Sequence, residues 1–248
     1  HVALDYPRSL LKALLDENVL VEVGPWRDGP PSVRFQYERM QDIFIARAML
    51  QSHLTTGGVL LDLRNSERMI ELWDSPWHNA GLLNALAIIL PAEHGLELLD
   101  IAPTDSREQA IETMLSTLPW RPLESVSPEI IELVLSTLEV GTPEALWGVL
   151  NTLLLLTAEP NHPLNARFLH EWLAQISMPQ RDAIWSAALL CNHDETTSST
   201  QRLLDWVNSR PDCNDIEDEA RLLLGLALGW MLATSHRPLR DYTTKALV

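Results

Sequence analysis

The stretch that decides the fold runs from Val33 to Leu50 and reads VRFQYERMQDIFIARAML. Apolar side chains occupy alternate positions at its start, at Val33, Phe35 and Tyr37, which is the period of a half-buried strand. From Glu38 onward the apolar residues follow the longer period of a helix. The sequence here therefore predicts a strand that runs directly into a helix.

The predicted helix should bury one apolar face. Met40, Phe44 and Ala48 recur four positions apart, and Ile43 and Ala46 lie beside them. Side chains four positions apart on a helix share one face. We therefore expect these residues to pack together on a neighbouring element.

The chain before this stretch predicts a helix from Pro7 to about Asn18 and a strand over 19–23. A loop rich in Gly and Pro over 24–31 separates this strand from the second one. Helix, two-stranded wing and helix are the closing elements of a winged helix. We therefore expect residues 1–56 to be the C-terminal part of a winged-helix domain.

The chain after this stretch predicts short helices joined by short loops, which is typical of α-solenoids. We expect residues 57–248 to form a truncated helical-repeat region of the HEAT or TPR type. The predicted fold class is therefore mostly α, with the end of a winged helix followed by an α-solenoid. The predicted helices span 66–74, 80–90, 95–100, 106–117, 128–138, 143–158, 164–176, 179–190, 197–208, 215–234 and 238 onward.

One motif occurs twice in the helical region. PQRDAIWSA at 179–187 and PLRDYTTKA at 238–246 share the pattern Pro-x-Arg-Asp, four residues and Ala. Arg181 and Asp182, like Arg240 and Asp241, follow a Pro at a predicted helix start. We expect each Asp to cap or complement the helix N-terminus and each Arg to contact a neighbouring helix. A role in partner binding is the alternative.

Composition limits the classes of function. The formal charge of −16, from 34 acidic and 18 basic residues, disfavours a general binder of nucleic-acid backbones. Two cysteines imply no disulfide framework, and neither a membrane span nor a signal peptide is predicted, so we expect a cytoplasmic protein. Because the chain begins without Met and ends within a helical pattern, we expect it to be a piece of a longer protein.

Motifs that would indicate catalysis are missing from the sequence. It contains no phosphate loop, no GxGxxG and no HExxH, and its eight His residues have no metal-ligand spacing. We therefore predict no catalytic residue, no metal and no cofactor bound by this chain. Seven of the nine Trp residues fall in or beside helical stripes, so we expect most of them to pack in the core: Trp73, Trp77, Trp147, Trp172, Trp185, Trp206 and Trp230. A minority on a concave surface could anchor a partner instead.

Phe35, Gln41, Asp42, Phe44 and Ala46 match the wing strand and following helix of many NACHT proteins. On these residues the chain resembles the winged-helix module of STAND-type signalling NTPases, in the NACHT-like branch that includes bacterial antiviral proteins. The segments 77–98, 165–170 and the two Arg-Asp helices resemble the helical sensor of the antiviral members. Where the family has a His that reaches the nucleotide phosphates, this chain has Tyr37, which can donate a hydrogen bond but is uncharged at neutral pH.

The resemblance implies that nucleotide binding and partner recognition belong to different parts of a longer parent protein. ATP, Mg²⁺ and the phosphate loop would belong to an NTPase domain upstream in cis, so the parent would be an ATPase. Tyr37 is the candidate nucleotide contact. The expected partners are a protein ligand, such as a phage protein, and further copies of the parent in an activated oligomer. Structural or hinge roles fall to the remaining matched and repeated residues: Phe35, Gln41, Asp42, Ala46, Arg181, Asp182, Arg240 and Asp241.

Three alternatives belong to other classes of protein. A helical-repeat scaffold without nucleotide coupling would leave Tyr37 and the wing facing solvent or another repeat. A winged-helix transcription regulator would need a basic face, whereas Asp16 and Glu17 lie beside the predicted hairpin. A stand-alone enzyme is disfavoured by the missing motifs.

Overall fold

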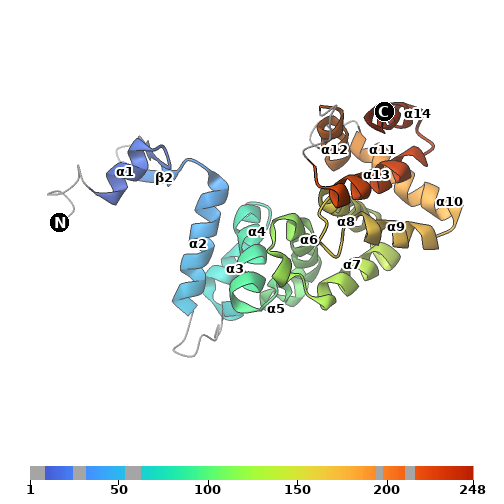
Figure 1. The fold of residues 1–248 in the computed structure, drawn as a ribbon. Helices are drawn as coiled ribbons and strands as arrows, with labels where there is room; N and C mark the ends of the chain where they lie inside the picture. Colours follow the sequence, from blue (N-terminus) through green and yellow to red (C-terminus); the bar gives the residue numbers. More distant parts are fainter. Residues whose placement is uncertain (1–8, 25–31, 54–62, 194–197, 210–215, 248) are drawn as a thin grey trace. The chain divides into compact units, whose positions relative to one another are not determined.

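The computed structural model describes residues 9–24, 32–53, 63–193, 198–209 and 216–247 (Figure 1). The described chain is mostly helical with one two-stranded antiparallel sheet, which confirms the mostly α class. It forms two compact units, His1–Met114 and Leu115–Val248. The predicted boundary between residues 56 and 57 lies outside the described residues and stays a prediction.

Helix α1 (Leu10–Asp16) is closed at both ends by local hydrogen bonds. Ser9 caps its start, since the serine side chain accepts a backbone N–H of the first turn. At its end the Val19 N–H donates to the Leu14 carbonyl, while Asn18 adopts a left-handed conformation with φ of 54°. This is the Schellman arrangement, and Asn tolerates the left-handed position that it requires. It turns the chain from the helix into the first strand.

Strands β1 (Leu20–Val23) and β2 (Ser32–Phe35) pair antiparallel, with Leu20 opposite Phe35. Helix α2 (Glu38–His53) begins after two further residues, so the predicted strand that runs into a helix is confirmed. Among the described residues from 9 to 45, none is buried. A two-stranded sheet alone is marginally stable in water, so this part of the chain depends on its attachment to α2.

The buried face of α2 differs from the predicted one. Met40 and Phe44 are 38% and 51% exposed, and Ala48 is exposed as well. The prediction was right for Ala46 and wrong for Met40, Phe44 and Ala48. The helix carries apolar side chains on more than one side, so periodicity alone could not select the buried one. Its main neighbour is α4 (Ala80–Ile89), and the fully buried side chains of α2 are Ala46, Met49 and Leu50.

The described residues of the first unit after α2 are mostly helical, and α4 contacts α2, η3 (Leu90–His94) and α5 (Leu98–Ile101). This helix buries five of its side chains, and Leu86 and Ala87 have no exposed area. Hydrophobic burial of this extent makes α4 the centre of the unit. The other helices here are η2 (Leu63–Asn65), α3 (Glu67–Asp74), η4 (Thr104–Ser106) and α6 (Arg107–Thr117), the last of which crosses the division between the units.

The second unit is built around two long apolar helices. Helix α8 (Pro143–Leu156) packs against α7, α9, α11 and α12, and α13 (Asp218–Leu232) packs against α9 and α14. The fully buried side chains of this unit include Leu150 and Leu153 of α8 and Leu223 of α13. The other helices are η5 (Leu118–Trp120), η6 (Leu123–Ser125), α7 (Pro128–Val140), α9 (Ala166–Gln175), α10 (Met178–Arg181), η7 (Asp182–Ser186), α11 (Ala187–His193), α12 (Ser199–Asn208) and α14 (Arg237–Leu247).

Each predicted helical segment contains a helix in the structure. The helix expected over 179–190 contains one π-helical turn, η7, between α10 and α11. Pro128 and Pro143 occupy the first position of α7 and α8, where the missing N–H of proline costs no hydrogen bond. In the part of the chain that the structure describes, no helix combines the length and the apolar character needed to cross a membrane.

Candidate functional site

The junction between β2 and α2 presents a tyrosine to solvent. Tyr37 is 67% exposed, and its backbone carbonyl accepts the N–H groups of Met40 and Gln41, which starts the helix. Beneath it, the Phe35 and Phe44 rings stack with centroids 5.0 Å apart and planes 9° apart. The stack ties the end of the strand to α2 and leaves the Tyr37 side chain accessible.

Asp42 and Ala46 lie on the side of α2 that packs in the first unit, so they hold the helix in place. The Asp42 carboxylate occupies the space beside Gly81 in the first turn of α4, where a Cβ would overlap it. Burial, with a smaller contribution from Glu38, raises the pKa of Asp42 above its usual value. Ala46 has no exposed area, and Gln41 is half-buried. These residues position the helix that follows Tyr37.

The first Arg-Asp pair contacts an aromatic side chain of a neighbouring helix. The Arg181 guanidinium carbon lies 4.9 Å from the centroid of the Trp230 ring of α13, and Nη2 donates to the Ile176 carbonyl at 3.3 Å. This contact is a cation–π interaction between α10 and α13. Asp182 accepts the Ser186 hydroxyl at 2.6 Å. Contrary to the expectation for the aspartate, the helix start is closed by a capping box formed by other residues: Ser177 and Gln180.

The second Arg-Asp pair has no such aromatic contact among the described residues. Arg240 and Asp241 are both exposed on α14. Asp241 lies 3.6 Å from the Arg237 Nε in an exposed ion pair, a kind that contributes about 0–1 kcal/mol. The repeated motif therefore marks two helix starts, each with Pro at the second position, whose arginines have different surroundings.

Three aromatic residues join the helices around Arg181. Trp185 is 1% exposed, and its indole N–H donates to the Trp230 carbonyl at 2.9 Å. The Trp230 indole donates to Nδ1 of His170 at 3.1 Å, which connects α13 to α9. A core position thus holds for Trp185, as for Trp73 and Trp172, whereas Trp77 and Trp206 are 75% and 36% exposed.

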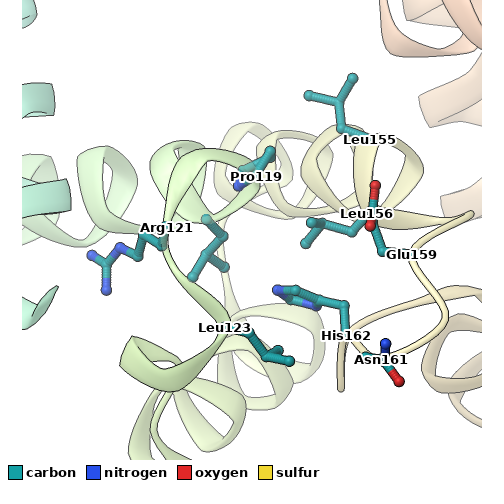
Figure 2. Close-up of a pocket in the computed structure, with 9 residues that line it drawn as sticks. Pro119, Arg121, Leu123, Leu155, Leu156, Glu159, Asn161 and His162 are labelled. Atoms are coloured by element: carbon teal, nitrogen blue, oxygen red, sulfur yellow. The ribbon is translucent and has the colours of Figure 1, made fainter.

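A pocket of about 390 Å³ lies in the second unit, between the η5–η6 segment and the loop from α8 to α9 (Figure 2). Sequence reasoning missed it because loops contribute most of its polar groups and no motif marks them. Figure 2 shows Leu123 and Leu156 on either side of the His162 ring and the Arg121 guanidinium directed away from it. The lining residues are Leu118, Pro119, Arg121, Leu123, Leu155, Leu156, Glu159, Asn161 and His162.

His162 is the buried titratable group of this pocket. The residue is 8% exposed, and its Nδ1 accepts the Leu164 N–H at 3.1 Å, so the neutral ring carries its proton on Nε2. Nε2 is covered and has no hydrogen-bond partner in the described part of the chain. An unpaired buried donor costs about 1–3 kcal/mol. Burial also lowers the pKa of His162 below its usual value of 6.5.

We expect acid to destabilise the second unit through His162. Because its pKa is lowered in the folded state, the unfolded chain takes up the proton first. The contribution to stability is therefore complete above pH 6.5 and is lost as the pH falls from there toward the folded pKa. Urea unfolding at a series of pH values should show this loss, and His162→Asn should flatten it. His78→Asn, at an exposed position, should leave the slope unchanged; an unchanged slope in His162→Asn would contradict the prediction.

No group of His, Cys, Asp and Glu suited to a metal ion occurs among the described residues. Cys213 lies outside them, as do the side chain of Cys191 and the residues of the wing loop. The matched residues of the first unit thus gather at the β2–α2 junction and on α2, whereas the Arg-Asp pairs lie on α10–η7 and α14 of the second unit.

Comparison with known proteins gives no relative on which a function could be based. The residues and geometry described above are therefore the basis for any functional assignment. No protein-family model, no curated protein and no solved structure matches the chain.

Proposed function

We propose that the chain is the regulatory and ligand-sensing part of a STAND NTPase of the NACHT-like branch. It would couple recognition of a partner protein, a phage protein in antiviral defence, to ATP-dependent oligomerisation and effector activation by the parent. The observation that carries the proposal is the junction of β2 and α2, where an accessible Tyr37 stands at the position of the family's nucleotide-sensing His. The order α1, β1, β2 and α2 agrees with the end of a winged helix.

The contacts around this junction suit a hinge. Phe35 stacks on Phe44, which links the predicted wing to α2, and the Asp42 carboxylate lies against Gly81 of α4. A nucleotide-binding domain that contacted Tyr37 would therefore act on α2 and, through it, on α4. A ligand shifts the equilibrium between the closed, nucleotide-bound form and the open form of the parent only by its difference in affinity for these two forms.

The helical second unit supplies the surface that the proposal needs for the protein ligand. Helical repeats form extended surfaces from successive helices, and such surfaces bind folded partners. Exposed apolar side chains are present on it, with Val140 at 81% and Met178 at 79%. Side chains of this kind are the ones that gain free energy when a partner covers them.

A second candidate function is a helical scaffold without nucleotide coupling. The exposure of Tyr37 at 67% and of Val33 at 43% agrees with a wing that faces solvent, as that function predicts. The two functions differ in whether Tyr37 takes part in a nucleotide response, and this can be measured.

In the full-length parent, we expect Tyr37→Ala to weaken the closed, nucleotide-bound form. Loss of one hydrogen bond of about 1 kcal/mol would lower the concentration of phage protein needed for assembly about fivefold. ATP hydrolysis and particle mass, measured with and without candidate phage proteins, report this shift. Tyr37→Phe isolates the hydroxyl, and Trp77→Ala removes another exposed aromatic ring of the same unit as a control. A parent without a phosphate loop, or one in which Tyr37→Ala assembles like the wild type, would favour the scaffold.

A further inference from the structure

The pocket between the η5–η6 segment and the α8–α9 loop has a mixed lining of polar side chains and leucines. Asn165 is 5% exposed and donates to the carbonyls of Glu159 and Pro160 at 3.1 and 3.3 Å. The backbone N–H of His162 donates to the Glu159 carbonyl at 3.1 Å. These bonds fix the loop that carries the Glu159, Asn161 and His162 side chains of the pocket. A ligand would therefore meet a pre-formed wall, and little free energy would be lost in ordering the loop.

The size and lining of the pocket suit a small ligand with an apolar body. Its volume of about 390 Å³ falls within the range of about 300–1,000 Å³ that small-molecule sites occupy. Leu123, at 40% exposure, and the half-buried Leu155 are the accessible leucines of the lining, whereas Leu118 and Leu156 lie buried behind it. Rotation of the Leu123 side chain would open access to the His162 ring beside it (Figure 2).

The polar groups of the pocket define the chemistry of the ligand. His162 has a buried Nε2–H donor without a partner among the described residues, so a ligand acceptor would satisfy it. Glu159 lies at the exposed rim and carries a negative charge, which favours a cation there. The Arg121 guanidinium points away from the ring, so it does not supply the opposite preference (Figure 2).

We propose that this pocket binds an apolar primary amine bearing a carbonyl acceptor, which is the chemistry of an amino-acid amide or of the first residue of a peptide. The ammonium group would lie at Glu159, the carbonyl oxygen would accept the His162 Nε2–H, and the apolar side chain would lie against Leu123 and Leu155. This inference goes beyond the proposed function and does not depend on it, because it concerns the pocket alone.

The probe for the test is phenylalaninamide, titrated into the whole 248-residue chain by calorimetry and by ¹⁵N NMR of the histidine rings. We expect saturable binding that shifts the His162 Nε2 signal and the Leu164 amide. N-acetylphenylalaninamide, which lacks the cation, and 2-phenylethylamine, which lacks the carbonyl, should each bind more weakly. Absence of saturable binding, or equal affinity for the three probes, would overturn the proposal.

Two variants locate the binding groups. His162→Asn keeps an acceptor near the Leu164 N–H but removes the Nε2–H, and it should weaken phenylalaninamide binding about tenfold. Glu159→Gln should weaken it about threefold, the effect of an exposed ion pair. The matched control is Glu132→Gln, an exposed carboxylate of α7 outside the pocket, which should bind like the wild type. Equal affinity in both pocket variants would place the ligand elsewhere and overturn the assignment.

If His162→Asn does not fold, the wild-type NMR shifts still decide where the probe binds, since shifts confined to residues outside the lining refute the site. A tripeptide amide, Phe-Ala-Ala-NH₂, separates the two sources of the ligand. Tighter binding of the tripeptide than of phenylalaninamide assigns the pocket to a peptide N-terminus. Equal or weaker binding assigns it to a free amino-acid amide.

Discussion

Replacing Trp185 by Ala is expected to lower the free energy of unfolding of the second unit by about 3–5 kcal/mol. Trp185 is 1% exposed within the π-helical turn η7, so truncation leaves a cavity the size of an indole ring. It also removes the hydrogen bond from the indole N–H to the Trp230 carbonyl at 2.9 Å, which joins η7 to α13. Equilibrium urea unfolding of the whole chain measures the loss. Hydrogen exchange then assigns it to the unit Leu115–Val248.

Two variants separate the sources of this loss. Trp185→Phe keeps most of the apolar contact but not the N–H donor, so about 1–2 kcal/mol should be lost. Trp77→Ala removes the same kind of side chain from a position that is 75% exposed, and it should change stability by less than about 0.5 kcal/mol. A Trp185→Ala chain no less stable than Trp77→Ala would show that η7 does not pack on α13 in solution.

Replacing Asn165 by Ala is expected to lower the free energy of unfolding of the second unit by about 2–4 kcal/mol. The reason is that this one side chain both caps α9 and holds the preceding loop. Its carbonyl oxygen accepts the Arg167 N–H at 2.9 Å and so caps α9. Its amide group donates to the Glu159 and Pro160 carbonyls at 3.1 and 3.3 Å. Because Asn165 is 5% exposed, water cannot replace these bonds without opening the loop.

Asn165→Asp tests the two roles separately in the same unfolding experiment. Aspartate keeps an acceptor for the cap, which alone would preserve stability. It loses both N–H donors and places a charge against two carbonyl oxygens, so we expect Asn165→Asp to be at least as unstable as Asn165→Ala. Ser198→Ala, which removes only the cap of α12, should cost about 1 kcal/mol and serves as the matched control. Wild-type stability in Asn165→Asp would show that the cap alone matters.

The helices and the hairpin could be predicted because their signals are local. Pro128 and Pro143 mark two helix starts, and the change of apolar period at Glu38 marks a third. The buried face of α2 could not be predicted in this way. It depends on the approach of α4, where Gly81 leaves room for the Asp42 carboxylate, and that contact joins residues distant in sequence.

The pocket and the contacts of Trp185, Trp230 and His170 could not be predicted either, because they too join residues distant in sequence. His162 is buried by η5 and η6, which precede it by a whole helix pair, so no spacing near residue 162 indicates its environment. The repeated Arg-Asp motif predicted two equivalent positions. Among the described residues, however, Arg181 is the one motif arginine whose guanidinium lies over the Trp230 ring of α13. The surroundings of a side chain are set by its tertiary neighbours, which a short motif does not record.

The lack of buried side chains among described residues 9 to 45 has a consequence for how the first unit responds to force or to a bound domain. Among the described residues, the β1–β2 hairpin has no buried side chain, and its ladder of backbone bonds and the Phe35–Phe44 stack help to hold it in place. Regions with few buried contacts open at a small fraction of the free energy of global unfolding. A force on this end of the unit is therefore expected to displace the β1–β2 hairpin before it disrupts α4, because disrupting α4 would expose its five buried side chains.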